Sequence, residues 1–306
     1  MRLQRWKEYA IVIVTTQILY AIGKSMTFYA QYLPADAENQ QHSFPVKLGD
    51  VWCTAKQLAP CSIGSPAIQA ILAAAHGDCC AQLLAGELPH EQVSTWTLAA
   101  LVLVMPSVLL VARHFASKAG RYPARLPSGD ALLGFVASVS WVGVVTLFIK
   151  KAVGRPRPNF LALGEVIAQS PALGGGTGRL GGNPRYSFPS GHASTSMAAL
   201  LYGALVAWGD AGALRGPRWQ RTLAVTLILV LPFLSLWVGV TRIQDYWHFQ
   251  DDVAAGWLVG ALSAVLGHAL AAQPPPLQHD DGDGGSARYH YLSQHLQLPN
   301  SPEAAV

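Results

Sequence analysis

Three short segments of the chain collect residues that could bind and attack a phosphate group. The first, residues 150–160, reads KKAVGRPRPNF and places Lys150 and Arg157 seven positions apart, with prolines on both sides of Arg157. A compact ammonium group and a planar guanidinium group are complementary ways to hold a phosphate. The pair is weak evidence alone, because basic residues often follow an apolar segment.

The second segment, residues 186–194, reads YSFPSGHAS and leads directly into an apolar stretch. Gly191 lets the backbone approach an anion closely, and Ser190 supplies a hydroxyl group at what should become a helix N-terminus. His192 would lie in the first turn of that helix and point at the bound anion. A single histidine at a membrane edge is more often structural, so this segment is also inconclusive alone.

The third segment, residues 241–252, reads TRIQDYWHFQDD and contains a histidine and an aspartate four positions apart. If a helix has begun there, His248 and Asp252 share one face and can form a hydrogen bond. Such a bond fixes the imidazole tautomer and makes the ring a better nucleophile, while Arg242 adds a third cation. Two other carboxylates are interpreted as helix caps or salt-bridge partners: Asp245 and Asp251.

The elements that must position these segments are membrane-spanning helices. Hydrophobic residues make up 51% of the 306 residues and charged residues only 12%, about half the charged share of soluble domains. The apolar residues form six stretches long enough to cross a hydrocarbon core as helices. We therefore predict an all-α fold, a six-span transmembrane helical bundle. The stretches are residues 9–33, 93–113, 131–149, 193–212, 222–241 and 253–272.

The lengths of the connections bring the three segments to one membrane face. Between His192 and Thr241 lie 48 residues, enough for two crossings and a short turn. The first and second segments are joined by a Gly-rich connection of about 30 residues that never has to cross. Two histidines, three cations, a glycine turn and a carboxylate therefore converge at one surface. The full set is Lys150, Arg157, Ser190, Gly191, His192, Arg242, His248 and Asp252.

Charge placement predicts the orientation of the bundle. An even number of spans leaves both termini on one side, and Arg2, Arg5 and Lys7 mark that side as cytosolic by the positive-inside rule. The three segments then lie on the lumenal or extracellular face of an endomembrane or the plasma membrane. Their surplus of external positive charge is explained if it binds an anion.

Cysteine placement supports the same orientation, because all four cysteines fall in one external connection. Disulfides persist in an oxidising compartment, and four cysteines allow three pairings, of which the one that joins the adjacent pair is disfavoured. Buried free thiols are the alternative. The cysteines are Cys53, Cys61, Cys79 and Cys80.

These features divide the chain into a cytosolic N-terminus at residues 1–8, a membrane domain at 9–272 and a cytosolic tail at 273–306. The membrane domain includes the external loop at 34–92, in which residues 65–75 are expected to form a short helix. The tail opens on three prolines and an acidic, Gly-rich run, a composition typical of disorder.

Together, the three segments resemble the signature of the type 2 phosphatidic acid phosphatase (PAP2) superfamily, which reads K-x6-RP, PSGH and SR-x5-H-x3-D. The resemblance covers roughly residues 95–272, and the one departure is Thr241, which replaces the serine of the third motif with another hydroxyl. The flanking sequences GRPRPNF, FPSGHAS and DYWH are more similar to the lipid phosphate phosphatase and diacylglycerol pyrophosphate phosphatase branch than to haloperoxidases or soluble acid phosphatases.

The resemblance implies a hydrolase of phospholipid metabolism that acts on phosphatidate, lysophosphatidate and diacylglycerol pyrophosphate through a phosphohistidine intermediate. It implies that His248, oriented by Asp252, attacks phosphorus, and that His192 protonates the leaving oxygen and then activates water. It also implies independence of magnesium, with no cofactor and no metal ligand. The implied phosphate-binding residues are Lys150, Arg157, Ser190, Gly191 and Arg242.

Other functions share some of these features. A polyprenyl pyrophosphate or sphingoid-phosphate phosphatase, a glucose-6-phosphatase-like enzyme and a lipid phosphotransferase would use the same histidine chemistry. A non-catalytic multi-span anion transporter should carry ionisable residues along its helices, and a silent relative should show a broken signature. The expected partners are a lipid phosphate substrate and membrane lipids; a homo-oligomer stays open. Nucleic acid is disfavoured, because a net charge of +4 comes without a basic cluster interleaved with aromatics.

Overall fold

The structure is a computed structural model that describes residues 2–25, 44–48, 50–58, 61, 78–84, 89, 91–122, 124–163, 185–211 and 217–272. The helix expected at 65–75 and the expected disorder of the tail at 273–306 lie outside these residues. The chain divides into two compact units, residues 1–271 and 272–306. Every element described below belongs to the first unit.

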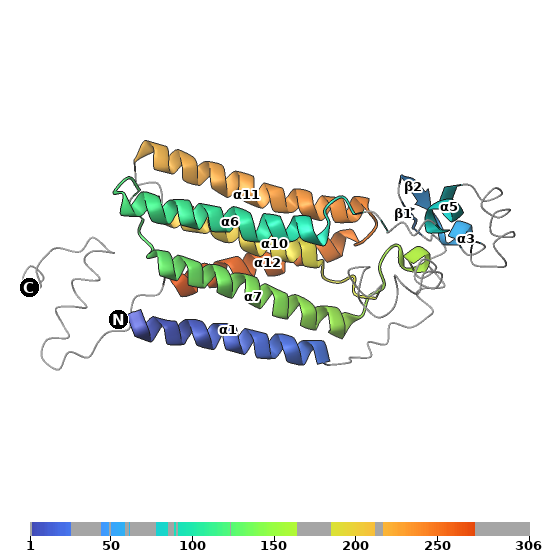
Figure 1. Cartoon of the computed structure of the whole chain (residues 1–306), viewed down its shortest axis with the longest axis horizontal. Helices are drawn as coiled ribbons and strands as arrows, with labels where there is room; N and C mark the ends of the chain where they lie inside the picture. The colour runs from blue at the N-terminus through green and yellow to red at the C-terminus, as the bar shows by residue number, and fades with distance from the viewer. Residues whose placement is uncertain are drawn as a thin grey trace, which may run out of the picture. The chain divides into compact units, whose positions relative to one another are not determined.

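Six long helices follow one another within the described residues (Figure 1). Four of them, α6, α7, α11 and α12, are long and apolar enough to cross a membrane, so the chain is a mostly helical integral membrane protein. The six helices are α1 (Arg2–Ser25), α6 (Thr95–Lys118), α7 (Ser128–Val153), α10 (Gly191–Asp210), α11 (Arg218–Gln244) and α12 (Gln250–Ala271).

Helices α1 and α10 are not among the four spans assigned by length and composition, so six spans are a proposal. The apolar part of α1, Ala10–Ser25, is shorter than a usual span. Helix α10 is rich in alanine, glycine and serine, and most of its length is buried against other helices. A helix that meets protein on nearly every side can do without the large apolar side chains by which lipid-facing helices are recognised.

Helix α10 lies at the centre of the bundle, in contact with α6, α7, α11 and α12, while α1 packs on α7. Its contact with α12 is close because glycines face it. A Cβ atom added to Gly256 would lie 2.7 Å from the Ser190 carbonyl oxygen, and one added to Gly260 would lie 2.3 Å from the Ser194 carbonyl oxygen. Small residues of this kind let membrane helices approach backbone to backbone. The first turn of α10 is therefore held directly against α12.

Hydroxyl groups add specific bonds between these helices. Thr146 on α7 and Ser194 on α10 are 2.9 Å apart at their hydroxyl oxygens, and the Tyr202 hydroxyl donates to the Ala131 carbonyl at 2.6 Å. Such bonds satisfy polar groups that have no water to bind inside a membrane. They fix the register of α10 against α7.

We expect Gly260→Ala to destabilise the protein by about 1–3 kcal/mol, because the added methyl group would overlap the backbone of α10. Gly143→Ala on α7 is the matched control, since nothing lies within 4 Å of a Cβ atom at that position. The control should be neutral, or slightly stabilising through helix propensity. Thermal midpoints of the purified variants check this prediction, and equal midpoints for the two variants would contradict it.

Outside the long helices, a small cluster is held together by two disulfides. Strands β1 (Val46–Leu48) and β2 (Val51–Cys53) pair antiparallel, with Val46 opposite Cys53, and short helices α3 (Ala55–Leu58) and α5 (Asp78–Leu84) lie beside them. This two-stranded sheet is the one departure from the expected all-α fold among the described residues.

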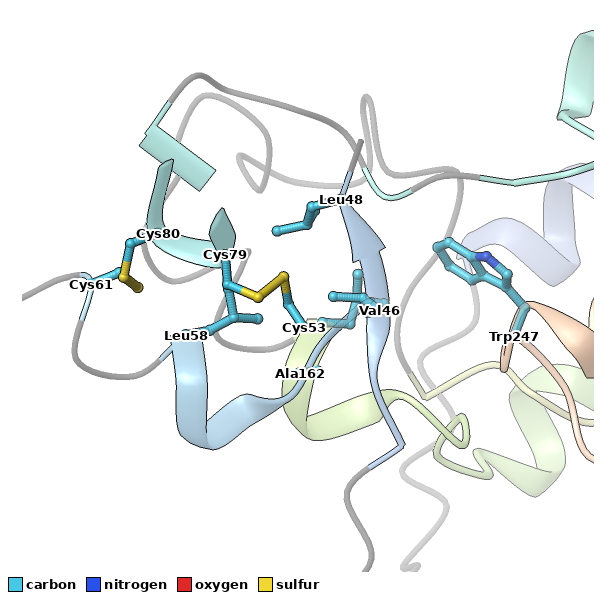
Figure 2. Packing of buried hydrophobic residues seen from close by; sticks show 10 residues of the cluster. Val46, Leu48, Cys53, Leu58, Cys61, Cys79, Cys80, Ala162 and Trp247 are labelled. Atoms are coloured by element: carbon cyan, nitrogen blue, oxygen red, sulfur yellow. A yellow bond between two sulfur atoms is a disulfide. The ribbon is translucent and has the colours of Figure 1, made fainter. Parts of the chain in front are cut away.

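The disulfides join Cys53 to Cys79 and Cys61 to Cys80. The adjacent pair is not bonded to itself, as expected, and the alternative of buried free thiols is wrong. Figure 2 shows the Cys53–Cys79 bond beside Val46 and Leu58. We call this buried group, together with three residues from other parts of the chain, the disulfide core. Its members are Val46, Leu48, Cys53, Leu58, Cys61, Cys79, Cys80, Ala162, Leu163 and Trp247.

Candidate active site

The three polar segments meet at one end of the bundle because of the direction in which each helix runs. Lys150 lies in the last turn of α7 and Arg242 in the last turn of α11, whereas His192 and Asp252 lie in the first turns of α10 and α12. The amide of Ser190, which caps α10, donates to the Asp252 carbonyl at 2.9 Å. This bond joins the second segment to the third.

Asp252 lies close to His248, but not in the arrangement that the spacing suggested. Helix α12 begins at Gln250, so His248 precedes the helix and does not share a helical face with Asp252. The Asp252 carboxylate instead reaches back to accept the Phe249 amide at 2.9 Å, as in a capping box. Its Oδ2 atom lies 3.7 Å from His248 Nδ1, which is longer than a hydrogen bond.

The Ser187 hydroxyl fills the space between the imidazole and the carboxylate. It donates to Asp252 Oδ2 and lies 3.5 Å from His248 Nδ1. Arg155 holds the other carboxylate oxygen, because its Nη1 atom donates to Asp252 Oδ1 at 2.8 Å and also pairs with Asp251. Both Ser187 and Asp252 are fully buried. Ser187 and Arg155 therefore hold in place the Asp252 carboxylate, which faces His248.

Arg242 is fixed by two acidic partners. Its Nη2 atom donates to Asp245 Oδ2 at 3.0 Å and its Nη1 atom to Glu91 Oε2 at 3.3 Å. Asp245 also caps α11 and accepts both the backbone amide and the side-chain amide of Gln92, at 2.8 and 2.9 Å. The expected role of Asp245 as a cap and salt-bridge partner is confirmed, as is the salt bridge of Asp251.

The other two cations are also held in place, but mainly by neutral groups. Lys150 donates from Nζ to the Tyr186 carbonyl at 2.7 Å. Arg157 lies over the Trp247 ring, with its guanidinium carbon 4.8 Å from the ring centroid. Burial lowers the pKa of Arg157 to about 10, so the side chain stays charged at neutral pH. Burial likewise raises the pKa of Glu91 above its ordinary value, against the opposing effect of Arg242 and Arg157.

Three buried nitrogen atoms at this end have no hydrogen-bond partner among the described residues: Arg157 Nε, Arg242 Nε and His192 Nε2. Most buried polar groups in proteins are paired, so such a cluster calls for an explanation. Gly191 adds open space, because a Cβ atom there would meet only Lys150 Cε, at 3.7 Å. The N–H groups that begin α10 also lack intrahelical acceptors. The arrangement fits an oxyanion that would accept all of these bonds.

Ser190 is the N-cap of a helix, unlike the other residues of the expected site. It is fully buried, and its hydroxyl accepts the Ala193 amide as the N-cap of α10. The hydroxyl therefore helps to start helix α10.

His248 is poised as a neutral imidazole. Its pKa is held well below the ordinary value of 6.5, first by burial and then by the charges of Lys150, Arg157 and Arg242, while a backbone hydrogen bond to Ser187 acts in the opposite direction. The neutral ring keeps the lone pair that a nucleophile or a base requires. Because Nδ1 faces Ser187 and Asp252, Nε2 is the nitrogen left to react.

An aromatic pocket of about 400 Å³ opens beside His248. Tyr246 lies on its wall with a left-handed backbone conformation, φ +57°, which costs a non-glycine residue on the order of 1 kcal/mol. Its ring packs against Phe44 and Trp52, with centroids 5.1 and 5.6 Å away. The lining residues are Phe44, Pro158, Ile243, Tyr246, His248, Phe249, Gln250 and Asp251.

Sequence reasoning missed Glu91, Arg155 and Ser187. Ser187 and Arg155 stand inside the second and first polar segments, so their position was a signal, but no spacing rule indicated their contacts with Asp252. Glu91 lies in the loop before α6, far from the three segments in sequence. Only the folded chain brings it to Arg242.

Similar proteins can now be compared with this arrangement. A family model described as the PAP2 superfamily matches residues 131–273. The chain is 34% identical over 182 residues to "Lipid phosphate phosphatase 1" of Arabidopsis thaliana, an alignment that covers 55% of this chain and 52% of the relative. It therefore spans about half the length of that relative.

Two further relatives are covered more fully. "Probable diacylglycerol pyrophosphate phosphatase 1" of Schizosaccharomyces pombe is 31% identical over 206 residues, which is 63% of this chain and 70% of the relative. "Lipid phosphate phosphatase 2" of Arabidopsis thaliana is 31% identical over 215 residues, which is 67% of this chain and 70% of the relative. No solved structure matches the chain significantly. The chain therefore belongs to the PAP2 superfamily, whose phosphatases are phosphoric monoester hydrolases.

Proposed function

We propose that the chain is a membrane-bound lipid phosphate phosphatase that hydrolyses phosphatidate, lysophosphatidate or diacylglycerol pyrophosphate without a metal ion. The observation that carries the proposal is the set of unpartnered buried nitrogens on Arg157, Arg242 and His192 beside a neutral, oriented His248. The names of the relatives support a lipid phosphate as the substrate class.

In the first step, His248 Nε2 attacks phosphorus in line and the bond from phosphorus to the lipid oxygen breaks. The leaving oxygen takes a proton from His192, which leaves diacylglycerol and a phosphohistidine. Lys150, Arg157, Arg242 and the Gly191 amide stabilise the non-bridging oxygens, on which charge lies in a loose transition state. Ser190 acts by holding the start of α10 rather than by touching the phosphate.

In the second step, water replaces the histidine. His192, now neutral, removes a proton from a water molecule, and the resulting oxygen attacks phosphorus while the bond to His248 Nε2 breaks. Inorganic phosphate leaves, and both histidines return to their starting states. Three fixed cations supply the charge that a metal ion provides in other phosphatases.

A lipid substrate fits the position of the site. The catalytic residues lie at the ends of helices that present large apolar side chains to the surroundings, such as Phe233 and Trp237 on α11, each at least half exposed. A substrate could keep its acyl chains beside these helices while its phosphate reaches the cations. The aromatic pocket beside His248 is proposed to hold the glycerol part of the substrate.

We further propose six spans with cytosolic termini, which puts the catalytic end on the lumenal or extracellular side. The two disulfides support this orientation, because disulfides persist in oxidising compartments. The proposed division keeps residues 1–8 and 273–306 on the cytosolic side of a membrane domain at 9–272.

The proposal is tested by assaying the purified protein with phosphatidate, diacylglycerol pyrophosphate, sphingosine phosphate and polyprenyl pyrophosphate in the presence of EDTA. We expect release of inorganic phosphate from the glycerolipids at a rate that added magnesium does not change. Strict dependence on magnesium would refute the metal-free mechanism. Uptake of phosphate into proteoliposomes without hydrolysis of any of the lipids would favour an anion transporter instead.

The pH dependence of kcat/KM should reveal how the neighbouring cations affect the pKa of His248. Because burial and then these cations lower the pKa of His248, the acid limb of kcat/KM should lie below the ordinary histidine range. Lys150→Met should move the limb to higher pH by removing one positive charge. Lys151→Met is the matched control, since the Lys151 Nζ atom donates to the Lys24 carbonyl at 2.6 Å, on α1. An acid limb in Lys150→Met that coincides with the wild-type limb would argue against this electrostatic account.

A further inference from the structure

A second buried cation with an unused donor lies at the opposite end of the bundle. Arg113 on α6 pairs side-on with Asp210 at the end of α10, from Nε to Oδ2 at 2.5 Å and from Nη2 to Oδ1 at 2.8 Å. Its Nη2 atom also donates to the Leu126 carbonyl. Its Nη1 atom is buried and has no partner among the described residues. Side-on pairing uses one edge of the guanidinium, so Nη1 lies at the other edge.

Arg113 also lines a largely apolar pocket of about 310 Å³, within the size range of ligand pockets. Asp210 and Leu126, which bind the paired edge of Arg113, are not among the described lining residues. Helices α6, α10 and α11 and the segment after α6 supply the walls. The lining residues include Leu109, Arg113, Arg121, Gly203, Trp219 and Leu223.

The pocket wall at Gly203 leaves more space than helix packing requires. A Cβ atom added to Gly203 would make only ordinary contacts, 3.7 Å from Leu231 and 3.8 Å from Leu109. Alanine would therefore fit at this position and would favour the helix by about 1 kcal/mol relative to glycine. The glycine leaves room on the pocket side of α10 that the protein itself does not fill.

Charge and aromatic residues at the rim indicate what the pocket binds. The described residues of the lining include two arginines, Arg113 and Arg121, and no carboxylate. Because Asp210 neutralises Arg113, the exposed Arg121 gives the rim its net positive charge. Trp219 is 51% exposed and packs edge-on against Tyr122 at 5.8 Å. Tryptophan at such a place is typical of the interface between acyl chains and headgroups.

We propose that this pocket binds an anionic phospholipid from the adjacent leaflet. One acyl chain lies against Leu109 and Leu223, and the headgroup phosphate accepts hydrogen bonds from Arg113 Nη1 and Arg121. The site is separate from the catalytic end, because Trp219 and Arg242 are about 35 Å apart along α11 at the helical rise. The proposal goes beyond the phosphatase activity and does not rest on it.

Native mass spectrometry of the full-length, delipidated protein tests the proposal with equimolar phosphatidylglycerol and phosphatidylcholine. Phosphatidylglycerol carries a phosphodiester, so it is no phosphomonoester substrate. We expect the wild type to retain it about tenfold more than phosphatidylcholine, because the trimethylammonium group of phosphatidylcholine would be repelled by the Arg121 side chain at the rim. Equal retention of the two lipids by the wild type would overturn the proposal.

Two variants on α6 locate the binding. Ala112 lines the pocket and is exposed, so Ala112→Phe should fill the space without disturbing the core and should lower retention of phosphatidylglycerol at least fivefold. Val111→Phe is the matched control, because Val111 is 53% exposed and does not line the pocket. Equal retention by the two variants would also overturn the proposal.

A third variant keeps the test decisive if Ala112→Phe does not fold. Arg121→Gln changes an exposed residue at the rim and should reduce the preference for phosphatidylglycerol over phosphatidylcholine by at least threefold. A preference unchanged in Arg121→Gln would refute the role of the basic rim. None of these readouts depends on phosphate release, so failure of the phosphatase proposal would leave the result interpretable.

Discussion

Purified His248→Ala should release phosphate from phosphatidate no faster than the background, a loss of roughly four orders of magnitude or more. The reason is that the variant lacks Nε2, the proposed nucleophile. Among the described histidines, only His248 lies beside both Ser187 and Asp252, so no other imidazole can replace it. Quenching the wild type during turnover of ³²P-labelled substrate should trap an acid-labile phosphoprotein. The variant should trap none.

His268→Gln is the control for this loss. His268 lies in the last turn of α12, beside Tyr202, so the change removes an imidazole far from the catalytic end. It should keep near wild-type turnover and the same phosphoprotein. Turnover by His248→Ala within tenfold of the wild type would exclude the phosphohistidine route, whatever substrate the enzyme prefers.

The second large effect is expected for His192→Ala, and its size should depend on the leaving group. With phosphatidate we expect a fall of about 10²–10⁴-fold, the range for loss of a general acid or base. With p-nitrophenyl phosphate, whose leaving group needs no proton, the first step should be much less affected. The second step still lacks its base. The variant should therefore give a burst of p-nitrophenol followed by a slow steady state, with the phosphoprotein accumulated.

Stopped-flow absorbance measures this burst, and its amplitude should approach one equivalent per active site. His114→Ala is the control, because His114 bonds the Ser128 hydroxyl at 3.0 Å near the far ends of α6 and α7. An equal loss for both substrates without a burst would show that His192 positions the phosphate and does not transfer protons.

The sequence predicted the long helices and the meeting of the three polar segments better than the contacts within the candidate site. Apolar length determines where a membrane helix can lie, so each of the six stretches overlaps a helix of the structure. The convergence of Lys150, His192 and Arg242 followed from helix direction and connection length alone. These properties are local to each segment or depend only on counting residues.

The contacts around Asp252 could not be predicted in the same way. The i, i+4 spacing of His248 and Asp252 suggested a shared helical face, but the capping interaction with the Phe249 amide starts α12 at Gln250. The fully buried Ser187 then occupies the space that a direct bond would have used. Asp252 could bond His248 directly or bond Ser187 instead. The choice depends on Ser187, which lies some sixty positions away in the sequence, and no spacing rule predicts that contact.

The span count and the disulfide pairing were uncertain for related reasons. Helix α10 buries alanine, glycine and serine residues against its neighbours and is not among the four helices that length and composition mark as spans. Four cysteines leave three pairings, and only the placement of β2 and α5 selects Cys53 with Cys79.

Trp247 is a member of the disulfide core, and its ring also supports the guanidinium of Arg157, one of the proposed phosphate-binding residues. We therefore expect loss of the two disulfides to loosen the cluster that contains this ring, and with it the support of the Arg157 side chain. Enzyme produced in a reducing cytosol should insert its helices correctly and yet hold its substrate poorly. For recombinant work, the choice of secretory route matters as much as the choice of detergent.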